Sequence, residues 1–298
     1  IFSTSLEGET ARSVFDAFSI FEASVAYVNL WQLIFAKTWS DVRQPAEVLA
    51  ACEKIRASIA ALLAPRLNGQ GEDIDDIASA VIAARDPQTG EKFTEKELID
   101  QIGVFFLAGH ETTASVLTWV FFILSQRPEI ADMLREEVDA AVGSSPVAFA
   151  DVKQLGKIRS VFREALRLYP PITFIPRVAA EATTIGDVRV KKGAMLMISP
   201  WTAHRNEALW ANAASFDPLR FYSQSDSSED EGVLMSFGLG PRVCVGAAFA
   251  MIESALIIAE LVRRYDFVVE DADRVRPVAR LTTRPAEEIR CRVRRRRN

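Results

Sequence analysis

Histidine and cysteine are scarce in this sequence. Its 298 residues contain two histidines, His110 and His204, and three cysteines, Cys52, Cys244 and Cys291. The odd number of cysteines, their wide spacing and the lack of a C-x-x-C pair argue against a disulfide framework or a zinc ribbon. Two histidines are too few for the usual histidine-rich zinc or di-iron sites. A metal ion would therefore need a thiolate, and the cysteine usage leads us to expect a cytoplasmic protein.

A positive net charge and long apolar runs are also lacking. The formal net charge is −5, which gives no general attraction for nucleic acid. The basic end, EIRCRVRRRRN, is interpreted as an edge strand because Ile289, Cys291 and Val293 alternate with arginines. No uninterrupted apolar segment reaches the roughly 20 residues of a membrane span. We therefore expect neither a nucleic-acid partner nor a membrane span.

Helical periodicity is the main pattern that the sequence does contain. It dominates residues 10–142, and a capping box of Thr94 and Glu97 predicts that the longest helix starts there and runs to about Ser125. Further helices are expected over 128–141 and in GKIRSVFREALRLYPP, which the prolines end.

Short strands and loops follow these helices. TTIGDVRVKKGAMLMISP contains two β-rich runs separated by Lys-Lys-Gly, which predicts a hairpin, and SQSDSSEDEG predicts a mobile surface loop. Apolar residues make up 49% of the chain, enough for a sizeable core. We expect one mainly α domain with small β-sheets (α+β) over 1–298, helix-rich over 1–170, with small sheets and a cysteine-containing loop over 171–298.

Cys244 lies between glycines in SFGLGPRVCVGAAFAMIESALIIAELVRRY, and an apolar helical pattern begins two or three residues later. The sulfur therefore precedes a helix N-terminus, where free N–H groups and the helix dipole favour negative charge. Gly238, Gly240 and Gly246 leave space for a flat, bulky partner, and Arg242 offers a positive charge to an acidic group on it. A small buried apolar cysteine is the alternative interpretation.

The spacing F-x-x-G-x-R-x-C-x-G, formed by Phe237, Gly240, Arg242, Cys244 and Gly246, resembles the haem-binding loop of the cytochrome P450 family. The resemblance extends over nearly the whole chain. It implies the mainly helical fold of that family and haem b (iron protoporphyrin IX) as cofactor. It also implies that these five residues bind the cofactor, with Cys244 as axial ligand of its iron.

The apolar run IGVFFLAGHETTASVLTWVFFIL is interrupted at its centre by a glycine and polar residues. A helical glycine costs about 1 kcal/mol relative to alanine, and buried polar groups cost more unless they are used. A kinked core helix is one interpretation. The second is the family's A-G-x-[DE]-T-[TS] motif, matched by Ala108, Gly109, Glu111, Thr112 and Thr113.

The resemblance assigns roles to this second motif. In the family it crosses the oxygen-binding face of the haem, which implies that Ala108 and Gly109 lie against the cofactor. Thr112 would hydrogen-bond bound O2, and Glu111 would relay protons, so these two are the candidate catalytic residues.

Glu164 and Arg167 stand three apart in EALR and so share one helix face, as many surface pairs do. Their position before LYPP and upstream of FDPLRF resembles the family's E-x-x-R motif, in which Arg220 would complete a buried triad. We assign these three residues to folding and to support of the haem loop.

The segment PPITFIPRVA contains Arg177, which is either a surface strand arginine or, by the resemblance, the partner of a haem propionate. His204 matches a family segment near the propionate side. The resemblance also predicts a substrate pocket that includes Phe105, Thr173, Phe174 and Ile175.

The activity that the resemblance implies is hydroxylation of a small apolar substrate with O2 and two electrons from an electron-donor protein, a ferredoxin or a flavoprotein reductase. A haem-thiolate sensor or carrier would keep Cys244 and Arg242 without needing Glu111 and Thr112. A haem-thiolate peroxygenase or isomerase often departs from that acid–alcohol pair. The intact pair favours the monooxygenase.

The opening residues, IFSTSLEGETARSVFDAF, begin without Met and with a helical pattern already running. We therefore expect the C-terminal portion of a longer protein. Family members carry an earlier Trp/His-x-x-x-Arg element for the other propionate; Trp31 lacks the arginine at that offset, whereas Trp39 and Arg43 have this spacing. We expect this chain to bind haem weakly or not at all and not to turn over, whereas its full-length parent would.

Overall fold

The structure is a computed structural model that describes residues 8–25, 44–69, 74–222, 234–280 and 282–296. The chain splits into two compact units, Ile1–His110 and Glu111–Asn298. The loop predicted at SQSDSSEDEG, together with Trp31 and Trp39, lies outside the described residues. The prediction of one domain over 1–298 stays a prediction.

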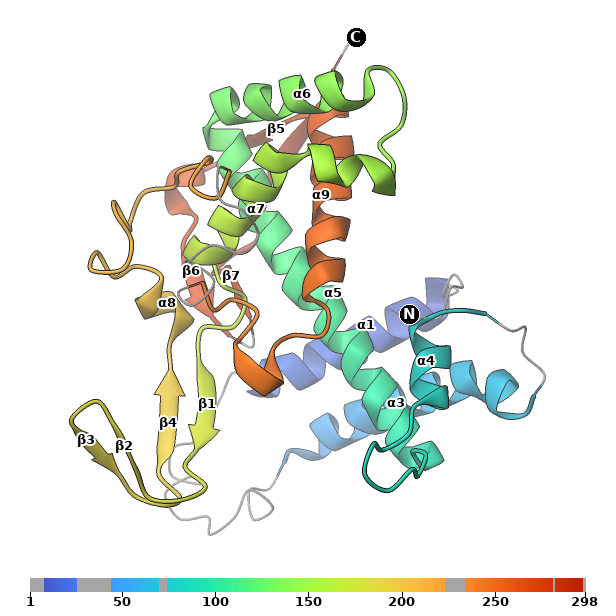
Figure 1. Ribbon diagram of the computed structural model, residues 1–298. Coiled ribbons are helices and arrows are strands. Elements are labelled where there is room, and N and C mark those ends of the chain that lie inside the picture. The colour runs from blue at the N-terminus through green and yellow to red at the C-terminus, as the bar shows by residue number, and fades with distance from the viewer. Residues whose placement is uncertain (1–7, 26–43, 70–73, 223–233, 281, 297–298) are drawn as a thin grey trace. The chain divides into compact units, whose positions relative to one another are not determined.

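The first unit is helical (Figure 1). It contains α1 (Gly8–Val25), α3 (Ala46–Leu67), α4 (Ile77–Ala83) and the start of α5 (Glu95–Gln126). α3 packs against α1 and buries one side of its surface, at intervals of three or four residues: Val48, Ala51, Ile55, Ile59 and Leu63. The predicted capping box opens α5, since the Thr94 N–H donates to Glu97 Oε2 at 2.8 Å and the Glu97 N–H donates to Thr94 Oγ1 at 3.3 Å.

Among its described residues, the second unit has a core built from four long helices. Its long helices are the remainder of α5, α6 (Pro128–Val142), α7 (Gly156–Leu168) and α9 (Ala247–Arg264). Short helical turns are η2 (Phe149–Gln154), α8 (Pro200–Ala203), η4 (Gly240–Arg242) and η5 (Ala272–Arg274). Each long helix contributes fully buried residues to the core, among them Val120, Leu134, Ile158 and Ile258. The helices predicted over 128–141 and after residue 155 are confirmed.

Within the described residues the strands form two-stranded antiparallel sheets. The pairs are β1 (Ile175–Val178) with β4 (Met195–Ile198), β2 (Thr183–Ile185) with β3 (Val188–Val190), β5 (Tyr265–Val269) with β8 (Cys291–Arg295), and β6 (Pro277–Ala279) with β7 (Thr283–Pro285). The edge strand predicted around Cys291 is confirmed. The mainly α fold with small sheets is confirmed as well.

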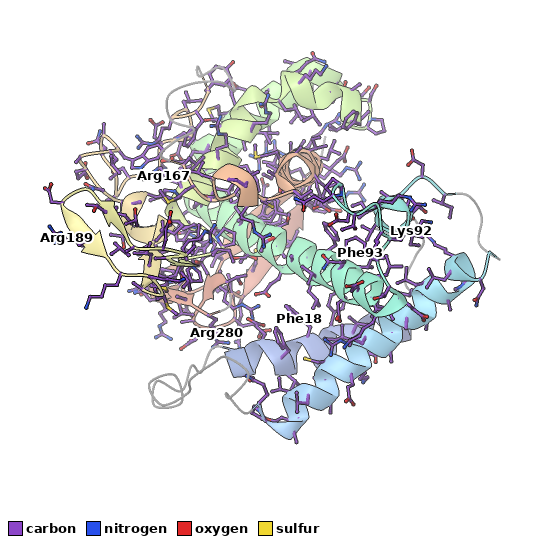
Figure 2. All side chains as sticks on the ribbon, turned by 60° about the horizontal axis from the view of Figure 1, so that its bottom comes forward. Phe18, Lys92, Phe93, Arg167, Arg189 and Arg280 are labelled. Atoms are coloured by element: carbon purple, nitrogen blue, oxygen red, sulfur yellow. The ribbon has the colours of Figure 1, made fainter. Side chains whose placement is uncertain are left out.

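The hairpin predicted around Lys-Lys-Gly is wrong in its pairing. The run before this turn folds back on itself as β2 and β3, with Gly186 at φ 56° between them. The run after it, β4, pairs instead with β1, Ile175 lying opposite Ile198. Arg189 extends outward from the β2–β3 hairpin (Figure 2), which has little burial, so local turn chemistry decides its pairing.

α5 is the described helix that could cross a membrane by length and composition alone. Its most apolar window of 18 residues has a mean hydropathy of 1.3 and is 44% buried. However, its Glu111 is buried and ion-paired with Arg284, and its Val116 and Val120 lie in the core of the second unit. We interpret α5 as a core helix.

Asp76 joins α4 to the end of α3. Its side chain accepts the Ser79 N–H at 2.9 Å as the N-cap of α4, while Arg66 binds its two oxygens at 2.6 and 2.8 Å. Hydrogen bonds from Arg66 hold the pKa of the Asp76 carboxyl well below its ordinary value. A carboxyl with a lowered pKa stabilises the fold above its unfolded pKa of about 4, and this contribution is lost as the pH falls through the folded pKa.

Asp76→Asn is expected to lower the free energy of unfolding by about 2 kcal/mol at neutral pH, because it removes the ion pair but keeps an oxygen for the cap. The loss should shrink as the pH falls below about 4, because the carboxyl then takes up a proton in the unfolded wild-type chain while it stays ionised in the folded one. Urea unfolding across this pH range measures both effects. Asp100→Asn, which removes an exposed pair with Arg56, is the control and should change stability little. A loss for Asp76→Asn that is independent of pH would contradict the assignment.

Candidate functional site

The loop that carries Cys244 is closed by its own backbone. The Cys244 N–H donates to the Phe237 carbonyl at 2.8 Å, and the Val243 N–H donates to the Gly240 carbonyl at 3.0 Å. Gly238 and Gly240 have φ angles of 73° and 72°, in the left-handed region that favours glycine. These two glycines therefore allow the tight turn that returns the chain to Phe237.

The Cys244 thiol is free and exposed at the end of this loop. α9 begins three residues later, at Ala247, so the partial positive charge of the helix N-terminus lies next to the sulfur in sequence. A Cβ at Gly246 would lie 3.8 Å from the Cys244 Sγ. Because glycine lacks that atom, this side of the sulfur stays uncovered and a bulky ligand can approach it.

Several exposed apolar residues lie close to Cys244 in the sequence. The exposed fractions of Leu239, Val243, Val245 and Phe249 are 49%, 54%, 79% and 60%. An exposed apolar group of this kind is typical of a surface that a ligand or partner covers. Arg242, also exposed, forms no hydrogen bond or ion pair in the described part of the chain, so its charge is available to an anionic group.

The predicted contact between Glu164, Arg167 and Arg220 is present. Arg167 donates from Nε and Nη2 to the two oxygens of Glu164, both at 2.8 Å, and both side chains are fully buried. Arg220 Nε lies 3.1 Å from the same two oxygens. The Asp217 N–H adds a further bond to Glu164 Oε1 at 2.9 Å. The carboxylate is therefore fully hydrogen-bonded, which makes its burial tolerable.

Arg167 uses all its N–H groups in this network (labelled in Figure 2). Besides its two bonds to Glu164, Nη1 donates to the carbonyls of His204 at 2.6 Å and Ala213 at 2.7 Å. Nη2 donates to the carbonyl of Ser215 at 3.0 Å. One guanidinium thus fixes the backbone that follows α8.

His204 connects the same network to the start of the cysteine loop. Its Nδ1 lies 3.1 Å from the Arg167 carbonyl, and its Nε2 accepts the Met235 N–H at 3.0 Å, so Nδ1 is the donor. Ser236 Oγ also donates to the Leu166 carbonyl at 2.9 Å. His204 is fully buried and both ring nitrogens bind the protein backbone, so its ring is not available to a propionate, and its predicted place near the propionate side stays a prediction. His204 supports the loop instead.

The polar centre of α5 is divided between the two units. Ala108 and Gly109 are exposed at the end of the first, where a Cβ added to Gly109 would meet no heavy atom within 4 Å. Glu111 and Thr113 are buried in the second unit, and Thr112 is partly buried. The motif therefore combines open space at the glycine with a buried acid.

Glu111 has two partners that the sequence analysis missed. Its Oε1 accepts the Thr282 hydroxyl at 2.5 Å and Arg284 Nη2 at 2.6 Å. Its Oε2 is buried and has no hydrogen-bond partner among the described residues. No sequence signal selects Thr282 and Arg284, since more than 170 positions separate them from the acid.

Arg177 and the predicted pocket residues Thr173, Phe174 and Ile175 lie together in and just before β1. Arg177 is exposed and donates from Nη1 to the Pro176 carbonyl at 2.9 Å, a local bond that leaves most of the guanidinium available. Ile175 and Arg177 share one face of the strand, because alternate residues point the same way. Phe105, in contrast, lies in the first unit, partly buried in α5.

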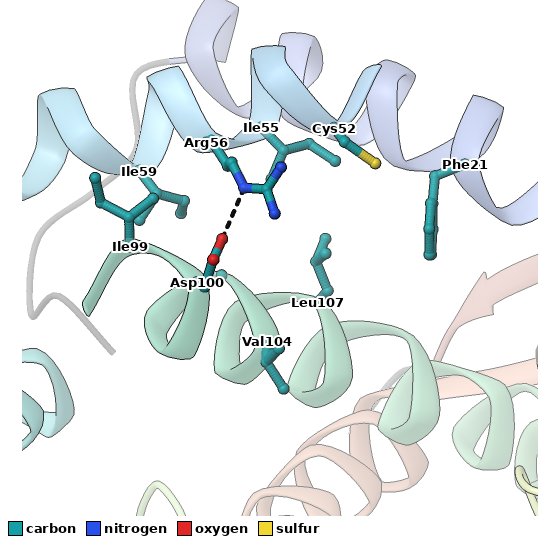
Figure 3. A pocket seen from close by; sticks show the side chains of 10 residues that line it. Phe21, Cys52, Ile55, Arg56, Ile59, Ile99, Asp100, Val104 and Leu107 are labelled. Carbon is teal, nitrogen blue, oxygen red and sulfur yellow. Dashed lines mark hydrogen bonds and ion pairs between the residues drawn. The ribbon is translucent and has the colours of Figure 1, made fainter. Parts of the chain in front are cut away.

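A small cavity of about 180 Å³ lies within the first unit (Figure 3). α1, α3 and α5 line it with mainly apolar side chains, and the Arg56–Asp100 ion pair of 2.7 Å lies beside it. Its lining includes Leu107 but none of the four predicted pocket residues. The prediction for those four residues stays a prediction.

An exposed thiol before a helix, with an arginine and exposed apolar residues nearby in the sequence, fits a protein that holds a bulky prosthetic group through sulfur. The chain belongs to the cytochrome P450 family, whose model matches residues 9–290. It is 36% identical over 217 residues to cyclooctatin synthase of Streptomyces melanosporofaciens. The matched region covers 73% of this chain and 46% of that protein. Pentalenene oxygenase of Streptomyces avermitilis is 35% identical over 220 residues, 74% of this chain and 49% of that protein.

The chain thus spans just under half the length of these curated relatives. Among solved structures, retinoic-acid-bound cyanobacterial CYP120A1 is similar with a TM-score of 0.82 at 22% identity, covering 95% of this chain and 63% of that one. This second similarity concerns the fold alone.

Family membership implies a haem-thiolate cofactor and O2. The residues present fit haem: Cys244 offers an exposed sulfur, Gly246 leaves its side open, and Val243 and Val245 offer apolar contact. Arg242 would suit a carboxylate at the edge of the ring. The sequence predicts this set of haem-binding residues, and it stays a prediction; the support of the loop through His204 and Ser236 became visible only in the fold.

Proposed function

We propose that this chain carries the haem-binding part of a monooxygenase that hydroxylates a small apolar molecule with O2 and two electrons from a ferredoxin or a flavoprotein reductase. The observation that carries the proposal is the exposed Cys244 thiol on its glycine-closed loop before α9. The relatives are about twice as long as the region matched here, so the proposed activity is that of a protein of their length that contains these residues. We also propose a cytoplasmic location, which rests on the cysteine usage.

The residues of this chain would divide the work as follows. When bound, haem activates O2 through its thiolate-ligated iron. Cys244 would hold the iron, while Arg242 and Arg177 would bind its propionates. Glu111 would carry a proton on its unpartnered Oε2, and the Thr112 hydroxyl would pass it toward the oxygen-binding face.

An apolar substrate is supported by two observations. The predicted pocket segment presents Phe174, 50% exposed, beside Ile175 at the start of β1. Two relatives carry names that refer to pentalenene and to cyclooctat-9-en-7-ol, both largely hydrocarbon by name. The proposal is therefore a binding pocket in which apolar burial supplies most of the affinity.

The absorption spectrum of the reduced, CO-bound protein tests the haem-ligand assignment. We expect the red-shifted Soret band of a thiolate-ligated haem in a polypeptide of the length of the relatives that contains these residues. In the 298-residue chain we expect a weaker band or none. A protein of the relatives' length that binds haem without that band would contradict the role of Cys244.

Thr112→Ala tests the monooxygenase chemistry. Without the hydroxyl, product formed per electron consumed is expected to fall by about tenfold or more, with hydrogen peroxide formed instead. Thr118→Ala is the matched control, because Thr118 is an exposed threonine of the same helix whose hydroxyl only bonds back to the Ala114 carbonyl. Equal coupling in wild type and Thr112→Ala would argue against the proposed proton path.

A further inference from the structure

The segment 282–284, which binds Glu111, is anchored by hydrogen bonds on two sides. The Thr283 carbonyl, between Thr282 and Arg284, accepts the Ser115 hydroxyl at 2.5 Å and the Trp119 Nε1–H at 3.1 Å. Both donors belong to α5, one and two turns beyond Glu111. The segment is therefore tied to the same helix that carries the acid, and cannot shift along it without breaking these bonds.

The other side of the segment is tied to the turn after α7. The Thr283 N–H donates to the Pro171 carbonyl at 2.9 Å, and its hydroxyl donates to the Pro170 carbonyl at 2.5 Å. Thr282 and Thr283 are 2% and 1% exposed. Every polar group of Thr283 is thus used for anchoring, which leaves its two neighbours to act on Glu111.

We propose that Thr282 and Arg284 are positioning residues that fix the Glu111 carboxylate, so that Oε2 alone is available to carry a proton. A carboxylate normally exchanges its two oxygens by rotation. Here a hydroxyl and a guanidinium both bind Oε1, at 2.5 and 2.6 Å, and rotation would break a charge-assisted bond. This inference rests on the proposed function, which gives the proton a use.

The burial of Glu111 supports an active use of Oε2. The residue is 7% exposed, and a buried carboxylate oxygen without a donor costs free energy. Among the described residues, the surrounding chain supplies two donors to Oε1 but none to Oε2, so the free-energy cost of burying Oε2 is not offset. The Arg284 side chain is 31% exposed, and its Nη2 binds Oε1 at 2.6 Å. Oε2 is left as the oxygen that can accept a proton from a water molecule.

A double-mutant cycle tests the contact without needing any cofactor. Unfolding by urea is measured for wild type, Glu111→Gln, Arg284→Gln and the double variant of the purified protein. If Arg284 holds Glu111, the unfolding equilibrium constant of the double variant should differ roughly tenfold from the value expected when the two single effects are multiplied. This difference corresponds to a coupling free energy of about 1.4 kcal/mol. Multiplicative effects would overturn the proposal. Arg280→Gln, an exposed arginine of the same hairpin, is the control (labelled in Figure 2) and should show no coupling to Glu111→Gln.

A second measurement tests the positioning role in a protein of the relatives' length that contains these residues. Each O2 that takes up two electrons and two protons without oxidising substrate leaves as hydrogen peroxide, so peroxide per electron pair reports misdirected protons. Arg284→Gln and Thr282→Val should each raise this fraction several-fold. Arg284→Lys, which keeps a charge, should restore it in part, and Arg280→Gln should not change it. An unchanged fraction in both Arg284→Gln and Thr282→Val would overturn the role.

The two measurements separate this inference from the proposed function. Coupling in the cycle together with a wild-type protein that lacks the thiolate-type Soret band would sink the proposed function and, with it, the proton role. A normal band and turnover with multiplicative stability effects would leave the proposed function standing and reject Arg284 as the residue that fixes Glu111.

Discussion

Replacing Cys244 with serine is expected to abolish the thiolate-type Soret band of the reduced, CO-bound protein and to stop turnover. A serine hydroxyl is a far weaker anionic ligand than a cysteine sulfur, and haem chemistry of this type depends on electron donation from the thiolate. The measurements are the CO difference spectrum and the rate of product formation in a protein of the relatives' length. Folding should be unaffected within about 0.5 kcal/mol, because Cys244 is exposed.

Cys291→Ser provides the matched control for this change. Cys291 is also a free, exposed cysteine, but it lies in β8. It should keep both the band and the turnover. If Cys244→Ser retained the band, another residue would have to be the ligand, and the assignment of the loop would be wrong.

Arg167→Met is expected to lower the free energy of unfolding by about 3–5 kcal/mol, the largest stability effect that the structure indicates. The change removes the ion pair of Arg167 with the buried Glu164 and leaves the pair of Arg220 with it. It also removes the donors to three backbone carbonyls, those of His204, Ala213 and Ser215. Chemical denaturation measures the loss, and Arg167→Lys should recover only a small part, because an ammonium with three N–H groups cannot reach the acceptors that the planar guanidinium binds.

The control for Arg167 is an arginine with the same type of partner on the surface. Arg292 binds Glu270 at 2.9 Å, with 63% and 48% of the two side chains exposed. Arg292→Met should cost at most about 1 kcal/mol, because exposed ion pairs contribute little. If Arg167→Met and Arg292→Met lowered the free energy of unfolding by similar amounts, the buried network would contribute no more to stability than an exposed ion pair.

The sequence predicted best what depends on near neighbours along the chain. Glu164 and Arg167 meet because three residues of helix separate them, and the box of Thr94 and Glu97 forms for the same reason. The start of α9 after Cys244 follows from the apolar period alone. In each case the geometry of one element decides the contact.

Contacts between distant segments were not predictable in this way. Arg284 meets Glu111 only because the segment after β6 returns to α5, and nothing in the residues themselves encodes that return. His204 matched a family segment, but the partners of its buried ring, the backbone of Arg167 and of Met235, are distant in the sequence. The β2–β3 turn was different: Gly186 gave a local signal, and the following Lys-Lys-Gly gave a competing one.

The bonds of Arg167 to backbone oxygens have a consequence for change over evolutionary time. Every residue presents a carbonyl, whichever side chain it has, so these anchors do not depend on which side chains stand at the exposed positions between residues 204 and 213. The stretch between them can therefore diversify its surface while the path toward the cysteine loop stays the same. We expect libraries randomised at the exposed positions 207–209 to fold far more often than libraries that vary Arg167 alone.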